Sequence, residues 1–176
     1  MSTLARTMAV ALALVAGMSA LAADTELKVK EGDKLPEIKL PSTGDKKELD
    51  LSSLKGKNVV LFFYPKAMTK GCTVESCGFR DVAEKFAGTD TVVVGISIDP
   101  LEKQAQFTTK EKLNFPLLAD SEGEIAKKLG VMADNGKVSK RVTFVIDKEG
   151  VIRKIYTKVT PATHPAEVLA FIKELK

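Results

Sequence analysis

Short apolar runs and amphipathic stretches alternate along most of this chain. The runs at 58–64 and 91–98 are continuous and rich in β-branched and aromatic residues, as in strands that are buried on both faces. Two further strands are predicted at 142–147 and 151–157, and the Lys-Glu-Gly segment at 148–150 between them is typical of a hairpin turn. These four strands form the framework of the predicted fold.

Helical patterns occupy the segments between and after the strands. Phe79, Val82, Ala83 and Phe86 recur at i, i+3, i+4 and i+7, which predicts one helix with a single apolar face. Residues 101–112 have a helical composition with a weak apolar stripe.

Two more helices are predicted towards the C-terminus. A capping box at 121–124 should open a short helix that Gly130 closes. Pro165 should lie in the first turn of a last helix, whose apolar side carries Val168, Leu169, Ile172 and Leu175. Strands that alternate with helices, followed by a hairpin and a final helix, predict an α/β fold with a central mixed sheet flanked by helices.

The N-terminus has the layout of a secretory signal peptide. An uncharged apolar run at 8–21 follows a short polar start with one charge, Arg6, and ends in small residues before Asp24. The run is shorter than the roughly 20 residues that span a bilayer, which disfavours a membrane anchor. We therefore expect residues 1–23 to be cleaved and the protein to be exported to the periplasm, with no stable membrane association afterwards.

Length and charge change this picture little. Residues 24–176 have the size of one ordinary domain. The chain has 27 Lys and Arg and 23 Asp and Glu, so loss of Arg6 with the leader leaves 26 against 23, a net charge of about +3. Such a small and scattered excess gives no reason to expect a nucleic-acid partner.

Two cysteines, Cys72 and Cys77, are the main chemical feature. In an exported chain two cysteines usually form one structural disulfide. Cys72, however, lies in the turn between a predicted strand and a predicted helix, where unpaired N–H groups and the helix dipole favour a thiolate. Lys66, Lys70 and Arg80 are close in sequence and add positive charge.

The spacing of the two cysteines also argues against a permanent bridge. Residues five apart in a regular helix have Cα atoms about 8.7 Å apart. A disulfide needs less than about 7 Å. If both cysteines lie in the first turns of one helix, they can bond only after that helix unwinds, which suits a catalytic cycle better than a structural bridge.

The segment around these cysteines, FYPKAMTKGCTVESCGFRD at 63–81, resembles the active-site stretch of peroxiredoxins. It contains that family's Pro-x-x-x-Thr-x-x-Cys motif as Pro65, Thr69 and Cys72. The second cysteine five residues later, followed by Gly-Phe-Arg-Asp, resembles the bacterioferritin comigratory protein, or PrxQ, subfamily. The similarity continues through the strand that begins near Arg141 to the segment at 161–169, and so covers nearly everything after the leader.

The resemblance implies a thioredoxin-like fold and a thiol peroxidase that needs no metal or organic cofactor. It makes Cys72 the peroxidatic nucleophile, which becomes a sulfenic acid, and Cys77 the resolving cysteine of an intramolecular disulfide. It implies that Thr69 holds the peroxide, that Arg141 stabilises the developing charge, and that Pro65 shields the site. The sequence departs from the family at Ala67 and Lys70, where Asp and Pro are common, but neither is a matched catalytic position.

The implied partners are a hydroperoxide substrate and a thioredoxin-like or other thiol reductant. We expect a monomer, because one chain supplies both sulfurs. Two other functions stay open at this point, an exported copper-binding thioredoxin-like module and a thiol–disulfide exchange protein. Both are disfavoured because four residues separate the cysteines, more than either class uses. His164, the only histidine, precedes the last predicted helix, where a helix cap or a surface role is expected.

Overall fold

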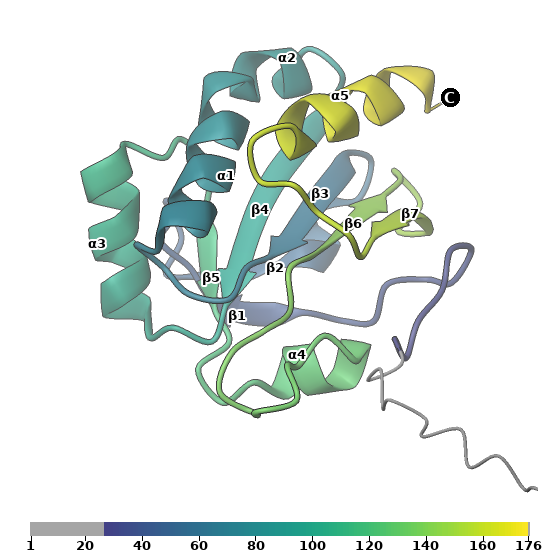
Figure 1. Cartoon of the computed structure of the whole chain (residues 1–176). Coiled ribbons are helices and arrows are strands. Elements are labelled where there is room, and N and C mark those ends of the chain that lie inside the picture. The colour runs from purple at the N-terminus through teal and green to yellow at the C-terminus, as the bar shows by residue number, and fades with distance from the viewer. Residues whose placement is uncertain (1–26, 176) are drawn as a thin grey trace, which may run out of the picture.

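A central mixed sheet with helices on both faces makes up the fold (Figure 1). The computed structural model describes residues 27–175, so the predicted leader at 1–23 lies outside the described residues. The sheet has the strand order β5-β4-β3-β6-β7. Its strands are β3 (Asn58–Phe63), β4 (Thr91–Ser97), β5 (Leu117–Ala119), β6 (Val142–Ile146) and β7 (Ile152–Tyr156).

Strand directions follow from the connections. β3, β4 and β5 are parallel neighbours joined by helical crossovers, whereas β6 and β7 are antiparallel, as the short turn between them requires. β3 is therefore flanked by the parallel β4 on one side and by the antiparallel β6 on the other. The predicted strands, the hairpin and the mixed sheet are confirmed.

Alternate side chains of β3 enter two separate cores. Val60, Phe62 and the following Tyr64 pack beneath α1 (Lys70–Asp81), α2 (Ala83–Ala87), α3 (Leu101–Glu111) and α5 (His164–Glu174). Val59, Leu61 and Phe63 face α4 (Glu124–Leu129) and the N-terminal segments. All six residues of β3 are buried, which explains its continuous apolar sequence.

The single helix predicted through Phe79 and Phe86 is wrong. α1 ends at Asp81, and α2 begins at Ala83. At Val82 the backbone leaves the helical region (φ −113°, ψ 10°), and its N–H donates to Phe79 O, three residues back. Phe79 and Phe86 are nevertheless both buried with ring centroids 6.0 Å apart, so the apolar pattern marked buried positions correctly but not helix continuity.

The predicted capping box is wrong as well. The residue before α4 is Gly123, at φ 66°, and the carboxylate of Asp120 accepts the N–H groups of Ile125 (3.2 Å) and Ala126 (2.8 Å) in place of a Ser121 cap. Gly130 ends the helix at φ 74°, as expected.

Four short elements were not predicted. They are the hairpin strands β1 (Lys39–Pro41) and β2 (Glu48–Asp50), the 3-10 helix η1 (Leu51–Leu54), and the edge strand β5. Residues 27–38, before β1, are mostly irregular. Within residues 27–175, no helix has the length and apolarity to cross a membrane.

Candidate active site

Cys72 lies in the first turn of α1, beyond the carboxyl end of β3. Its side chain is 1% exposed. Thr69 is the residue before the helix, so the N–H groups of residues 70–72 have no partner within it. The position predicted from sequence, at the change from strand to helix, is confirmed.

Arg141 directly precedes β6. Its Nη2 donates a hydrogen bond to Cys72 Sγ at 3.3 Å, although 69 residues separate the two in the chain. Gly71 leaves room for this approach, because a Cβ there would make a tight contact of 3.3 Å with the same Nη2 atom. The structure therefore brings a guanidinium into contact with the predicted nucleophile.

Glu75 binds the other side of the Arg141 guanidinium, and it was not identified from the sequence. It lies one helical turn after Cys72 and is fully buried, and its Oε2 accepts a hydrogen bond from Arg141 Nη1. Burial raises the pKa of the Glu75 carboxyl to about 7, although Arg141 acts in the opposite direction. Arg141 thus bridges the buried Glu75 carboxyl and the Cys72 sulfur, and these two contacts hold its guanidinium in one orientation.

Pro65 and Thr69 lie in the loop between β3 and α1. Pro65 is half-buried, and Thr69 Oγ1 donates to Lys66 O at 3.0 Å, so the Thr69 side chain does not cap the helix. Met68, between them, has a left-handed backbone (φ 65°) that is costly for a residue of this type.

Contacts from beneath the loop hold this conformation. Asp99, after β4, accepts the N–H of Ala67 at 2.7 Å, and Ser139 Oγ donates to Tyr64 O at 2.8 Å. Asp99 is itself buried and also accepts from Lys103 Nζ at 2.7 Å. The loop that carries Pro65 and Thr69 is thus tied to β4, α3 and the segment before β6.

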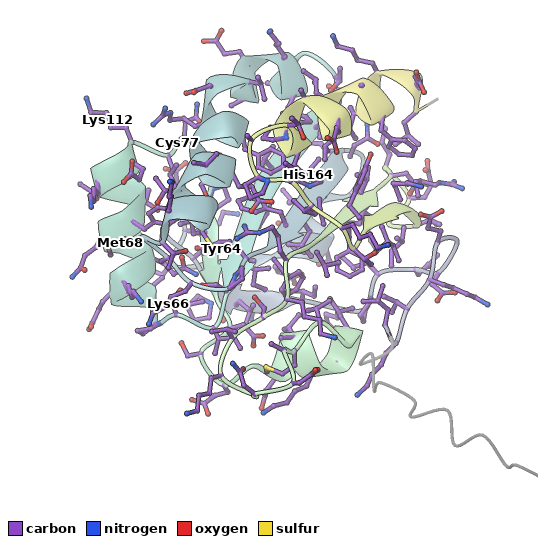
Figure 2. All side chains as sticks on the ribbon, viewed as in Figure 1. Tyr64, Lys66, Met68, Cys77, Lys112 and His164 are labelled. Carbon is purple, nitrogen blue, oxygen red and sulfur yellow. The ribbon has the colours of Figure 1, made fainter. Side chains whose placement is uncertain are left out.

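Cys77 lies on the side of α1 that faces α3 (Figure 2). It is half-buried, and its Sγ lies 3.5 Å from Arg80 Nη1 and 3.7 Å from Glu111 Oε2. Burial raises the pKa of the Cys77 thiol, Arg80 lowers it, and Glu111 raises it further. Arg80, a positive charge close in sequence to Cys72, places its guanidinium against Cys77.

Both cysteines are free thiols in the same helix, as the spacing argument assumed. Lys66 and Lys70 are exposed at the start of α1. The side chain that contacts the Cys72 sulfur is Arg141, which the family resemblance indicated and local sequence did not.

His164 is buried as the first residue of α5, and Thr163 is the residue before that helix, so His164 has neither the helix-cap nor the surface role expected for it. Its Nε2 lies 2.8 Å from Thr143 Oγ1, two residues after Arg141 in β6. The ring packs edge-on against Phe79 of α1 and Tyr156 of β7, at 5.8 and 5.1 Å between centroids. Burial lowers the pKa of His164 to about 4, so the ring is neutral at pH 7. Within residues 27–175, no group of three His, Cys, Asp or Glu side chains is placed to bind a metal ion.

Comparison with known proteins places this arrangement in a family. The AhpC/TSA family matches residues 31–155. Peroxiredoxin Bcp of Bacillus subtilis is 42% identical over 156 residues, which are 85% of this chain and 98% of that protein. Peroxiredoxin Bcp of Escherichia coli is 36% identical over 152 residues, which are 83% of this chain and 97% of that protein.

Solved structures agree with the sequence relatives. The crystal structure of peroxidoxin BcpB from Mycobacterium tuberculosis has a TM-score of 0.76 and 39% identity, and the match covers 84% of this chain and 98% of that chain. A mutant of PrxQ from Xylella fastidiosa has a TM-score of 0.77 and 27% identity, with 82% and 96% covered. This chain therefore belongs to the AhpC/TSA family and has the thioredoxin-like fold of its Bcp/PrxQ peroxiredoxins, which are thiol peroxidases.

Proposed function

We propose that this peroxiredoxin reduces hydrogen peroxide and organic hydroperoxides with Cys72 as the peroxidatic nucleophile and Cys77 as the resolving cysteine. The observation that carries the proposal is the 3.3 Å contact between Arg141 Nη2 and Cys72 Sγ. A guanidinium hydrogen bond is charge-assisted and favours an anionic sulfur. The unpaired N–H groups and the positive dipole end of α1 act in the same direction.

In the first half of the cycle, the Cys72 thiolate attacks one oxygen of the hydroperoxide. An S–O bond forms and the O–O bond breaks, and the leaving hydroxide or alkoxide takes up a proton and departs as water or alcohol. Arg141 stabilises the charge that develops on the leaving oxygen. Thr69 Oγ1 donates its hydrogen to Lys66 O. Its lone pairs therefore remain able to accept a hydrogen bond from the O–H of the bound peroxide. Pro65 shields the sulfur from water.

In the second half, Cys77 converts the Cys72 sulfenic acid into an intramolecular disulfide. Cα atoms five residues apart in a helix are about 8.7 Å apart, beyond disulfide range. α1 must therefore unwind between the two cysteines before the sulfurs meet. A thioredoxin-like protein or another thiol reductant then returns both cysteines to thiols.

We further propose that the protein works as an exported monomer in the periplasm after cleavage of residues 1–23. The apolar run at 8–21 and the small residues after it support cleavage, and the presence of both sulfurs in one chain supports a monomeric cycle. The leader lies outside the described residues, so its sequence alone supports this part.

The test is a peroxide-consumption assay with dithiothreitol on the wild type, Cys72→Ser and Cys77→Ser. We expect turnover to be lost in Cys72→Ser and to persist, partly or in a donor-dependent way, in Cys77→Ser. The two variants are matched controls for each other, because each removes one of the two sulfurs from the same helix. Undiminished turnover in Cys72→Ser would overturn the assignment.

Two further measurements address the cycle and the location. After peroxide treatment, nonreducing gels should show an oxidised monomer, and a dominant disulfide-linked dimer would contradict resolution within one chain. The N-terminus of protein recovered from the periplasm should begin at Ala23 or Asp24, and an intact Met1 would contradict cleavage.

A further inference from the structure

The C-terminal end of α3 packs against the part of α1 that carries Cys77. The Cys77 thiol donates to Glu111 Oε2 at 3.7 Å, and Arg80 Nη1 donates to the backbone carbonyl of the same Glu111 at 2.6 Å. Arg80 Nη1 also lies 3.5 Å from Cys77 Sγ, and Asn114 Nδ2 donates to Arg80 O at 3.3 Å. Two contacts thus join α1 to Glu111, the last residue of α3, and Asn114 in the loop after α3 adds a third.

Both sulfurs lie within 3.5 Å of a guanidinium nitrogen, but only Cys77 also contacts a carboxylate. Cys72 Sγ accepts a hydrogen bond from Arg141, an interaction that favours the anion. Cys77 instead donates its proton towards the Glu111 carboxylate, an interaction that favours the neutral thiol. Burial is the largest cause that raises the pKa of the Cys77 thiol, Glu111 on α3 and Asp81 on its own helix raise it further, and Arg80 on its own helix lowers it.

We propose that Glu111 is a positioning residue that keeps Cys77 a protonated thiol while α1 is folded, so that peroxide reacts at Cys72 first. The inference rests on the roles proposed above for the two cysteines. Glu111 was not singled out in the sequence, because its contact with Cys77 spans 34 residues of chain.

Unwinding of α1 would then release the resolving cysteine. Cys77 leaves the Glu111 carboxylate, loses its proton to solvent, and attacks Sγ of the Cys72 sulfenic acid. The S–S bond forms as the S–O bond breaks, and the departing hydroxide takes up a proton and leaves as water. Glu111 thereby orders the two sulfur reactions without touching the peroxide.

The test uses the Cys72→Ser chain, in which Cys77 is the only thiol. The alkylation rate of Cys77 by iodoacetamide is measured from pH 6 to pH 10 in this background, with and without Glu111→Gln. Gln has the same shape and removes the negative charge. Glu102→Gln is the matched control, since Glu102 is an exposed carboxylate on the first turn of the same helix α3. Circular dichroism checks that all three proteins are folded.

With Glu111→Gln we expect the midpoint of the rate profile to move to lower pH while the plateau at high pH stays the same. The rate at pH 7 should rise about threefold, the effect expected of one ionic contact at a half-exposed position. Glu102→Gln should leave the profile unchanged. An unchanged midpoint with Glu111→Gln overturns the proposal, and so does a rate that rises equally at every pH, because that indicates a loosened helix and not a lost charge.

The result is independent of the peroxidase test, because no peroxide is present. If turnover fails to depend on Cys72 while the profile shifts as expected, the proposed function fails but the Glu111 effect on Cys77 stands. If turnover is lost in Cys72→Ser and the profile does not shift, only this inference fails.

Discussion

Acid should destabilise this protein through His164. The ring is buried, bonded to Thr143, and packed between Phe79 and Tyr156, so the folded state has no room to solvate a charged imidazole. Its pKa is about 4 when folded, against an ordinary 6.5. Between these values the unfolded chain binds a proton that the folded chain does not, so the free energy of unfolding falls as the pH drops from 6.5 towards 4.

The magnitude follows from these two pKa values. Linkage gives a loss of about 2 kcal/mol from His164 alone between pH 7 and pH 5. His164→Gln removes the titration and keeps a group able to bond Thr143. The quantity to measure is the free energy of unfolding in urea at pH 7, 6 and 5, followed by circular dichroism under reducing conditions. The wild type should lose about 2 kcal/mol more than His164→Gln across this range.

Other titrating groups largely cancel in this comparison. The Glu75 carboxyl, with its raised pKa, gives the opposite trend, because its contribution is lost as the pH rises from its ordinary value towards 7. Two charged groups act on His164: Glu167, whose Oε2 lies 3.9 Å from Nδ1, raises its pKa, and Arg141 lowers it. Equal pH dependence in the wild type and His164→Gln would show that burial of His164 does not set the acid sensitivity. Because His164 contacts Phe79 of α1, we also expect peroxidase activity to fall in the acidic pH range in which this free energy of unfolding is lost.

Three further substitutions test the geometry around Cys72. Arg141→Met removes the cation in contact with the sulfur and should slow the reaction with peroxide by about 10²- to 10³-fold in a competition assay, and a rate within twofold of the wild type would contradict its role. Glu75→Gln weakens the buried pair with Arg141 and should lower the free energy of unfolding by about 1–3 kcal/mol in urea, whereas unchanged stability would show that the pair contributes nothing. Asp99→Asn weakens the hydrogen bond from Ala67 N–H, and it should lower the free energy of unfolding by about 1–2 kcal/mol and slow the peroxide reaction. The exposed control Asp90→Asn should do neither. Equal effects of the two substitutions would show that Asp99 does not hold the loop in place.

Much of the sheet could be predicted from the sequence because its signal is local. The runs at 58–64 and 91–98 are apolar on both faces, and a strand with that pattern can lie only inside a sheet covered by helices. β5 could not be found in the same way, since three residues are too few to show a pattern and its pairing with β4 is long-range. The break at Val82 was also hidden, because the apolar positions on both sides of it keep helical spacing.

The site residues also differ in whether their signal in the sequence is local or long-range. Cys72, Thr69 and Pro65 belong to one short motif and could be located from it, and Arg141 could be located only by its resemblance to the family. The contacts of Glu75 with Arg141 and of Cys77 with Glu111 join residues 66 and 34 positions apart, which no local pattern encodes. His164 shows the limit most clearly, because a lone histidine before a helix carries no sign in the sequence of the core that surrounds it.

The proposed cycle requires Cys72 to be the sulfur that peroxide oxidises. In the Cys77→Ser chain, treatment with stoichiometric hydrogen peroxide followed by dimedone and peptide mass spectrometry tests this directly. We expect a dimedone adduct on the peptide that contains Cys72, with the peroxide consumed. Unmodified Cys72 with the peroxide still in solution would contradict it.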